Sequence, residues 1–327
     1  MKAMSRSHIV EIDRGVVDRP EPLAALARQC YSDMAITVED AASVWRIRLT
    51  PLAPIAAAYD RELGAVLAED GIGLNGIMGW HRWRRCGRAI WLESLANAWA
   101  LAGWSHWLSA GRAARPLIIL VGGRGSLKVP ALVCEPELRA FRGLIDDEFL
   151  HLDDPDTVAV AVERGLVGPS SFVTPFLRAC PADIVHVVSD TQAADGHGPA
   201  RFTVAAAPWP PDATVSCLAL SQDDEGTCSW RQITEPTMLT AFRDRDQPVF
   251  VHIDLSFFDM VPERRRPSYL IASLPRPVAQ FVEHLAPFSG TIAAVTIAYA
   301  PGLCPSRRWA ELVGELRATL EPLLAET

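Results

Sequence analysis

The sequence predicts an α/β fold, a three-layer α/β/α sandwich with a mostly parallel central sheet. Short runs rich in Val and Ile are bounded by turn residues, which is typical of buried strands. Segments with helical periodicity lie between these runs, and strands that alternate with helices predict β-α-β crossovers. The chain has 327 residues, which is enough to bury a large core.

The expected elements follow from these patterns. The clearest strands are residues 116–121, 184–188, 214–220, 249–255 and 290–298. The helical patterns cover residues 22–31, 53–68, 92–110, 136–149, 278–285 and 308–324. Residues 192–211 are rich in Gly, Ala, Asp and Pro, and we interpret them as a long loop or an edge excursion. The whole chain, 1–327, is therefore predicted to be a single domain.

Composition excludes several classes of protein. The formal net charge of −8 argues against a general nucleic-acid binder, which needs a clustered basic excess. No apolar run reaches the roughly 18 residues of a membrane span, and the N-terminus has no apolar signal-peptide core. The seven cysteines are scattered without a C-x-x-C pair, so a disulfide framework or a structural zinc is not expected. These features predict a cytoplasmic protein.

The first candidate site follows the strand in LIILVGGRGSLKVP, residues 117–130. Glycines let backbone amides approach an anion, but the spacing fits neither G-x-x-x-x-G-K-[ST] nor G-x-G-x-x-G. Gly122, Arg124 and Ser126 occupy alternate positions, so an extended chain presents them on one face. Ligands of parallel sheets bind at such carboxyl strand ends.

The second candidate site ends the strand in VFVHIDLSFFDM, residues 249–260. His252, Asp254 and Ser256 also alternate and share one face. Asp254 is either a buried strand-end aspartate satisfied by loop amides or part of a functional cleft. A Ser/His/Asp nucleophile is conceivable here, but no G-x-S-x-G elbow is present. General acid–base work by His252 or Glu93 is favoured over it.

These segments resemble the arginase-like (ureohydrolase-fold) proteins, and among them the peptide arginases. In that family the first strand end carries D-x-H-x-D and the second carries I-D-x-D-x-F. Gly122, Arg124 and Ser126 stand at the three positions of the first motif, whereas Asp254 and Ser256 stand at the two carboxylates of the second.

Three further segments resemble the family in the same order. WLESLANAWALAGW (residues 91–104) is similar to its D-x-H-x-x-A stretch, with Glu93 at the acidic position and Leu95 in place of the histidine. Residues 168–188 resemble its G-x-F-I-x-P stretch, and residues 291–305 resemble its closing strand and S-P-G-x-x-P turn. Residues 1–90 lie outside the resemblance and form an N-terminal portion of their own.

The resemblance implies an arginase-like fold whose metal site is lost. Of six ligand positions that it places, only Asp254 keeps a ligand, because the others are Leu95, Gly122, Arg124, Ser126 and Ser256. One carboxylate cannot hold the two manganese ions that activate a bridging water. We therefore expect no metal cofactor and no arginase-type hydrolysis. We hypothesise that the Arg124 guanidinium pairs with Asp254 in the place of the cations.

The resemblance also implies a setting. We expect a metal-free pseudoenzyme that acts in the biosynthesis of ribosomal peptides or amino-acid-derived natural products in bacteria. It would bind a peptide or small-molecule substrate, or act as the partner of another biosynthetic enzyme, and homo-oligomerisation is left open. The alternatives are a metal-independent isomerase, cyclase or hydrolase that uses the same cleft, and a hydrolase with one atypical metal held by Asp254, His252 and Glu93.

The expected site residues follow from these readings. The catalytic candidates are Asp254, His252, Arg124 and Glu93, and the substrate-binding candidates are Ser126, Ser256, Gly122 and Arg264. Arg264 belongs to PERRRPSY, residues 262–269, just after the Asp254 strand. A second basic run, HRWRRCGR (residues 81–88), could grip an acidic peptide or phosphate, but a solvated helix face or loop is the favoured interpretation.

Overall fold

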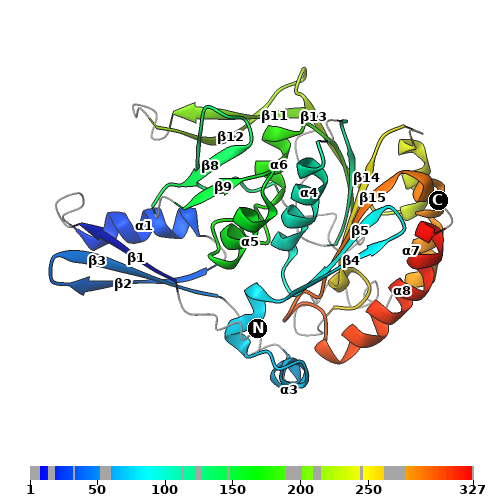
Figure 1. The fold of residues 1–327 in the computed structure, drawn as a ribbon, viewed down its shortest axis with the longest axis horizontal. Coiled ribbons are helices and arrows are strands. Elements are labelled where there is room, and N and C mark those ends of the chain that lie inside the picture. The colour runs from blue at the N-terminus through cyan, green and yellow to red at the C-terminus, as the bar shows by residue number, and fades with distance from the viewer. Residues whose placement is uncertain are drawn as a thin grey trace.

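The computed structural model describes residues 8–13, 19–31, 34–51, 60–111, 114–122, 127–145, 148–188, 201–208, 215–243, 246–260 and 277–325. Within these residues the chain forms a twelve-stranded sheet and a separate three-stranded sheet. Helices pack against both sheets, as Figure 1 shows. The α/β class expected from the sequence is confirmed.

Six neighbouring strands at the centre of the large sheet are parallel. Their order across the sheet is β5 (Ala89–Ser94), β15 (Ile292–Ala298), β14 (Val249–Asp254), β6 (Leu117–Val121), β10 (Asp183–Val187) and β13 (Cys228–Ile233). Every residue of β6, β14 and β15 is buried. A strand that is covered on both faces reads as a continuous apolar run, which explains why these strands were predictable.

Both ends of the sheet are antiparallel. β4 (His81–Cys86) pairs with β5 at one edge. The other end adds β11 (Arg201–Pro208), β12 (Ser216–Gln222), β7 (Leu132–Cys134), β8 (Ala140–Gly143) and β9 (Phe149–His151). The sheet is therefore mixed, and the expectation of a mostly parallel sheet holds only for its central strands.

The central strands contribute to two apolar cores. Ile118 and Leu120 of β6 join one core, whereas Leu117, Ile119 and Val121 join the other, because successive side chains of a strand point to opposite faces. The first core includes side chains of α4 (Ala100–Ser109), α5 (Pro155–Glu163) and α6 (Val173–Ala179). The second includes α3 (Leu63–Glu69), α7 (Val278–Glu283) and α8 (Trp309–Ala325).

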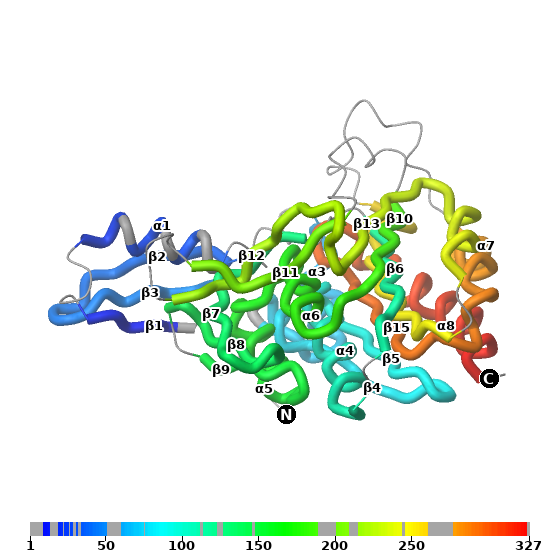
Figure 2. Tube along the Cα trace, turned by 90° about the horizontal axis from the view of Figure 1, so that it is seen from above, coloured from blue at the N-terminus to red at the C-terminus, as the bar shows by residue number. Residues whose placement is uncertain are grey.

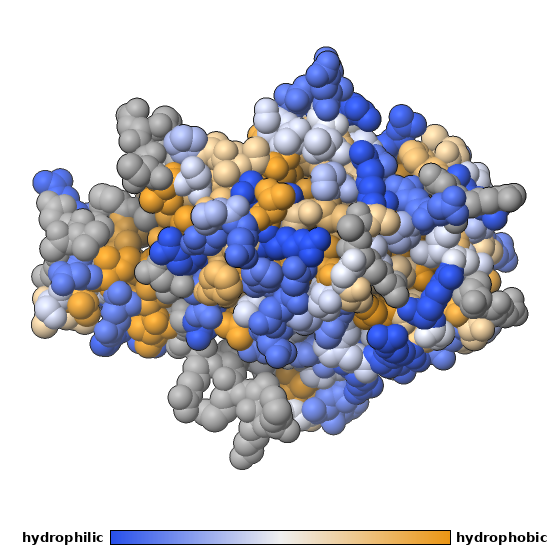
Figure 3. Space-filling model, turned by 45° about the horizontal axis from the view of Figure 1, so that its top comes forward, coloured by the Kyte–Doolittle hydropathy of each residue, from blue (hydrophilic) through white to orange (hydrophobic). Residues whose placement is uncertain are grey.

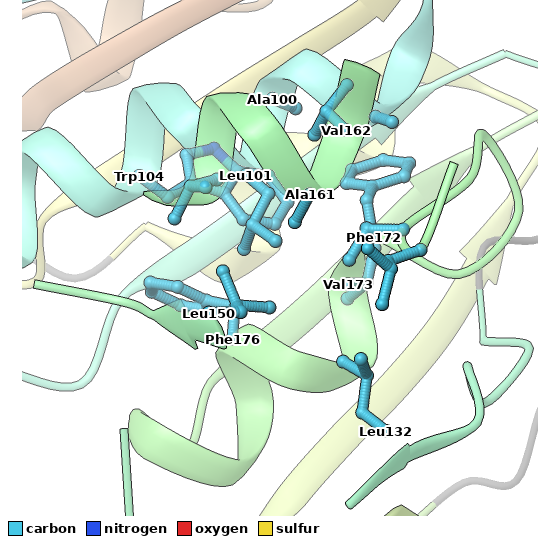
Figure 4. Close-up of a cluster of buried hydrophobic side chains, with 14 of the residues drawn as sticks. Ala100, Leu101, Trp104, Leu132, Leu150, Ala161, Val162, Phe172, Val173 and Phe176 are labelled. Atoms are coloured by element: carbon cyan, nitrogen blue, oxygen red, sulfur yellow. The ribbon is translucent and has the colours of Figure 1, made fainter. Parts of the chain in front are cut away.

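Aromatic rings fill much of the first core. Figure 4 shows Trp104 of α4 near Phe172 and Phe176, with ring centroids 5.5 and 5.2 Å apart. Phe172 also reaches a histidine of the central sheet, His252, at 5.1 Å. The core thus extends directly beneath the strand ends that carry the candidate site.

The N-terminal portion forms the small sheet. β1 (His8–Asp13), β3 (Val44–Pro51) and β2 (Met34–Ala41) are antiparallel in that order, and α1 (Pro20–Cys30) contacts β2 and β3. Figures 1 and 2 place these elements at one end of the molecule, with α7 and α8 at the other. The buried side chains Trp45, Ile47 and Leu49 of β3 belong to the first core, so the small sheet shares that core with the main sheet.

Several element predictions were wrong in detail. Residues 136–149 were expected as a helix but contain β8 and the start of β9, because their apolar residues pair across a hairpin. Residues 92–110 begin as strand β5 and become α-helical only at Ala100. Within residues 192–211, interpreted as a long loop or an edge excursion, residues 201–208 form β11 in the antiparallel end of the sheet. Residues 52–59 of the expected helix 53–68 lie outside the described residues.

Short 3-10 helices complete the described chain. They are η1 (Leu74–Gly79), η2 (Asn97–Trp99), η4 (Pro236–Phe242), η5 (Leu255–Phe257), η8 (Ala286–Thr291) and η9 (Ser306–Arg308). No helix in the described part of the chain is long and apolar enough to cross a membrane. The face in Figure 3 mixes hydrophilic and hydrophobic residues.

Candidate functional site

A small pocket lies at the carboxyl ends of the central parallel strands. It is lined by Asn97, Leu120, Val121, Gly122, His186, His252 and Asp254, and we call it the edge pocket. These residues come from η2, β6, β10 and β14 and the turn after β6. Its cavity volume is about 10 Å³, close to the space that one water molecule occupies.

Asp254 is the acidic group of the edge pocket. Its side chain is 3% exposed and accepts three hydrogen bonds. Oδ2 accepts from Asn97 Nδ2 at 2.9 Å, and Oδ1 accepts from the Ser256 backbone N–H at 2.9 Å and from Ser256 Oγ at 2.6 Å. These donors stabilise the carboxylate, but none of them carries a charge. Among the described residues Asp254 has no ion-pair partner.

His186 lies on β10 beside the turn that follows β6. Its Nε2 is 2.7 Å from the Gly122 carbonyl oxygen, and because a carbonyl only accepts, Nε2 must carry the proton. Burial lowers the pKa of His186 to about 4, although the Gly122 carbonyl acts in the opposite direction. The ring is therefore neutral at pH 7, and Nδ1 is a bare acceptor with no described partner.

His252 lies on the neighbouring strand, β14. Its Nδ1 is 2.9 Å from Thr296 Oγ1 on β15, and its ring packs against Phe172. Burial and, to a smaller extent, the nearby His186 lower the pKa of His252 to about 3. Nε2 of His252 has no hydrogen-bond partner among the described residues.

Gly122 allows two strand ends to approach each other closely. Its φ is +143°, and a Cβ built on it would lie 2.7 Å from the Asp254 Cβ. Residues with a side chain rarely adopt this φ and could not tolerate that contact. Gly122, at a ligand position of the motif that the sequence resembles, therefore has a structural role. Its carbonyl oxygen also accepts the hydrogen bond from His186.

Glu93 lies apart from the edge pocket. It is 1% exposed and forms a bidentate ion pair with Arg317 of α8, at 2.8 and 2.5 Å, with further hydrogen bonds from Trp91 and Tyr299. Burial would raise the pKa of Glu93, but the hydrogen bonds and the charge of Arg317 outweigh it and leave the pKa lowered. The structure thus does not bring Glu93 to His252 and Asp254.

The other predicted residues divide into two groups. Ser256 lies at the site and binds Asp254. Arg124, Ser126 and Arg264 lie outside the described residues, so the proposed pairing of Arg124 with Asp254 stays a prediction. The basic run at residues 81–88 is a strand, β4 (His81–Cys86), with a turn after it, and the interpretation as a helix face or loop was wrong.

Sequence reasoning missed two residues of the edge pocket. His186 was not among the expected site residues, although only one of its ring nitrogens has a partner among the described residues. Asn97 received no role, although it stands two residues after the position that matches a family histidine. A buried polar residue in an apolar strand, or close to a matched motif, was the available signal.

The donor set does not fit the metal centre that the resemblance implies. Gly122 and Leu95 have no ligating atom, and Ser256 donates its hydroxyl proton to Asp254. In the part of the chain that the structure describes, no group of three or more His, Cys, Asp and Glu side chains is placed to hold a metal ion. The described residues therefore offer no place for a manganese pair.

Comparisons with protein-family models and with curated protein sequences give no match to this chain.

Proposed function

We propose that this chain is a metal-independent, arginase-fold protein of the cytoplasm that binds a peptide or an amino-acid-derived substrate in a biosynthetic pathway. The edge pocket is its substrate-binding site. The resemblance of the ordered segments is the reason for proposing a biosynthetic pathway, and the geometry of the edge pocket is the reason for proposing a binding role. The helices that contribute to the cores on both faces of the central strands support the arginase-like three-layer arrangement.

One observation carries this proposal. Three buried polar atoms without a described partner belong to residues that line one cavity: Asn97 Oδ1, His186 Nδ1 and His252 Nε2. A buried polar atom without a hydrogen bond costs about 1–3 kcal/mol, and such atoms are rare in native proteins. A polar group of a ligand would satisfy them in place of the one water molecule that the cavity has room for.

Binding is favoured over acid–base catalysis on physical grounds. An efficient general base has a pKa near the working pH, whereas burial holds the pKa values of His186 and His252 at about 4 and 3. The serine does not suit nucleophilic catalysis either, because Ser256 Oγ donates to Asp254 and not to a histidine. A metal-independent enzyme that uses the same pocket is the second candidate, favoured by the adjacency of His252 and Asp254.

The test compares the peptides and amino-acid-derived metabolites of the source organism by mass spectrometry. The strains compared lack the gene, carry it, or carry Asp254→Asn, with exposed Asp223→Asn as the matched control. We expect deletion to change a product, the control to restore it, and Asp254→Asn to fail although the protein accumulates normally. Restoration by Asp254→Asn would show that the edge pocket is not the working part. Accumulation of a precursor that the purified protein converts would favour the enzyme.

A further inference from the structure

We propose that the edge pocket binds the primary ammonium group of its ligand. The inference rests on the proposed function and names the substrate class, an alkyl amine or a peptide with an accessible amino group. Its basis is that the described lining offers acceptors and negative charge in a space of one small polar group.

Two of the three unpartnered atoms of the edge pocket are acceptors, Asn97 Oδ1 and His186 Nδ1, whereas His252 Nε2 donates or accepts according to the tautomer of its ring. Asn97 donates its Nδ2 protons toward a carboxylate, which can only accept, so its unpartnered Oδ1 is an acceptor. His186 donates from Nε2 to the Gly122 carbonyl, so its unpartnered Nδ1 is an acceptor as well. The carboxylate of Asp254 adds a third acceptor. A primary ammonium has three N–H donors and no acceptor, which matches this set.

The charge of the lining has the same preference. Asp254 contributes a carboxylate, and the lining residues that the structure describes include no Arg or Lys. Asn97 and Asp254 are 7% and 3% exposed, so water screens the charge poorly. A cationic guest would compensate the carboxylate, whereas an anionic guest would meet both the carboxylate and a row of acceptor atoms.

The size of the edge pocket separates an ammonium from larger cations. A cavity volume of about 10 Å³ suits one group of the size of water. A guanidinium carries three nitrogens around a carbon and a tetramethylammonium carries four methyl groups, so both exceed this space. Leu120 and Val121 add apolar wall that can contact the carbon stem next to the ammonium.

The experiment titrates small cations into the protein labelled with ¹⁵N-histidine. The ring signal of His186, assigned with His186→Gln, is followed by NMR. n-Butylammonium represents an aliphatic amine and glycinamide represents a peptide amino terminus. Tetramethylammonium, guanidinium and potassium chloride at equal ionic strength are the comparison cations.

We expect a saturable shift of the His186 signal with n-butylammonium or glycinamide, and the tighter of the two identifies the source of the amine. Asp254→Asn should weaken this binding roughly tenfold or more, and exposed Asp223→Asn should not. If Asp254→Asn does not fold, Asn97→Ala tests the same site, because it removes the Oδ1 acceptor, and it should also weaken binding.

Several results would overturn the inference. One is the absence of a saturable shift with either amine. Another is binding of the amines by the Asp254→Asn and Asn97→Ala variants as tightly as by the native protein. A third is tighter binding of guanidinium, tetramethylammonium or potassium than of the amines. Binding of the amines only to Arg124→Gln would show that Arg124 fills the pocket in the native protein, which also contradicts it. If no amine binds in the NMR titration but the product in the source organism still depends on Asp254, only the ammonium inference fails and the proposed function stands.

Discussion

At the residue scale, Gly122 and Asp254 show how neighbouring strand ends form the edge pocket. The absence of a side chain at Gly122 lets its backbone approach Asp254, and its carbonyl then fixes the ring of His186. A single residue thereby fixes the position of one pocket histidine and makes room for the carboxylate.

Gly122→Ala should destabilise the protein by about 2 kcal/mol or more, because the alanine Cβ would meet Asp254 at 2.7 Å and the φ of +143° is unfavourable for alanine. The measurement is the free energy of unfolding in urea. Gly314→Ala is the control, since nothing lies within 4 Å of a Cβ at this position of α8, and it should stabilise by about 0.5–1 kcal/mol. Equal effects of the two changes would contradict the close approach.

The buried histidines predict a pH dependence of stability. Because the pKa of His186 falls from 6.5 to about 4 on folding, the unfolded chain binds a proton more readily between these values. Stability must then fall as the pH drops through this window. From pH 7 to pH 5 the contribution of His186 is about 1–2 kcal/mol. His186→Gln should lose less stability over this interval than the native protein, and an unchanged loss would contradict a buried neutral ring.

At the element scale, Glu93 connects the central sheet to the C-terminal helix. β5 positions its buried carboxylate, and α8 supplies Arg317. The guanidinium of Arg84 from β4 lies over the ring of Trp91, 4.3 Å from its centroid. The three elements β4, β5 and α8 therefore meet around the Glu93 carboxylate. The contacts explain why Glu93 is buried without belonging to the edge pocket.

Arg317→Met should cost roughly 3 kcal/mol, because it removes the bidentate partner of the buried Glu93 charge and leaves only Arg84, whose Nη2 lies 4.0 Å from Glu93 Oε1. The double variant with Glu93→Gln should cost less than Arg317→Met alone, because no uncompensated charge remains. Urea unfolding of both single variants and the double variant measures the coupling. Arg46→Met is the comparison, since Arg46 and Glu11 have side chains 39% and 51% exposed and should contribute under about 1 kcal/mol. A double variant as unstable as the sum of the single variants would contradict this interpretation.

At the scale of the whole molecule, the small N-terminal sheet and the main sheet share one apolar core. Trp45, Ile47 and Leu49 of β3 belong to the same core as Trp104 and Phe250. Met34 of β2 also lies against Gly165, in the turn that follows α5. These contacts indicate that the small sheet is stabilised by the main body.

The small sheet should therefore unfold together with the central strands. Hydrogen exchange along a urea series should show that amides of β3 and β6 lose protection at the same denaturant concentration. Leu49→Ala, at a fully buried position, should shift both together and cost about 2–5 kcal/mol. Earlier exchange of β1, β2 and β3 while β6 stays protected would show an independent unit.

The parallel strands β6, β10, β14 and β15 were predictable from the sequence, as was β12, but β5, β13 and the other strands of the antiparallel ends were not. Continuous apolar runs such as residues 117–121 mark strands that are covered on both faces. The short strand β7 pairs with the distant β12, and β8 pairs with its chain neighbours β7 and β9. The local pattern of residues 136–149, which include β8, resembled a helix. Alternation placed His252, Asp254 and Ser256 on one face, whereas the parts played by Asn97 and His186 depend on strand order across the sheet, which no local pattern encodes.

The central claim is that Asp254 belongs to a binding pocket that works without a metal centre. The most direct measurement is the metal content of the purified native protein after incubation with Mn²⁺, Zn²⁺ or Fe²⁺ and removal of the excess, with Asp254→Asn alongside. We expect far less than one ion per chain in both proteins. One or more ions per native chain, lost in Asp254→Asn, would contradict it.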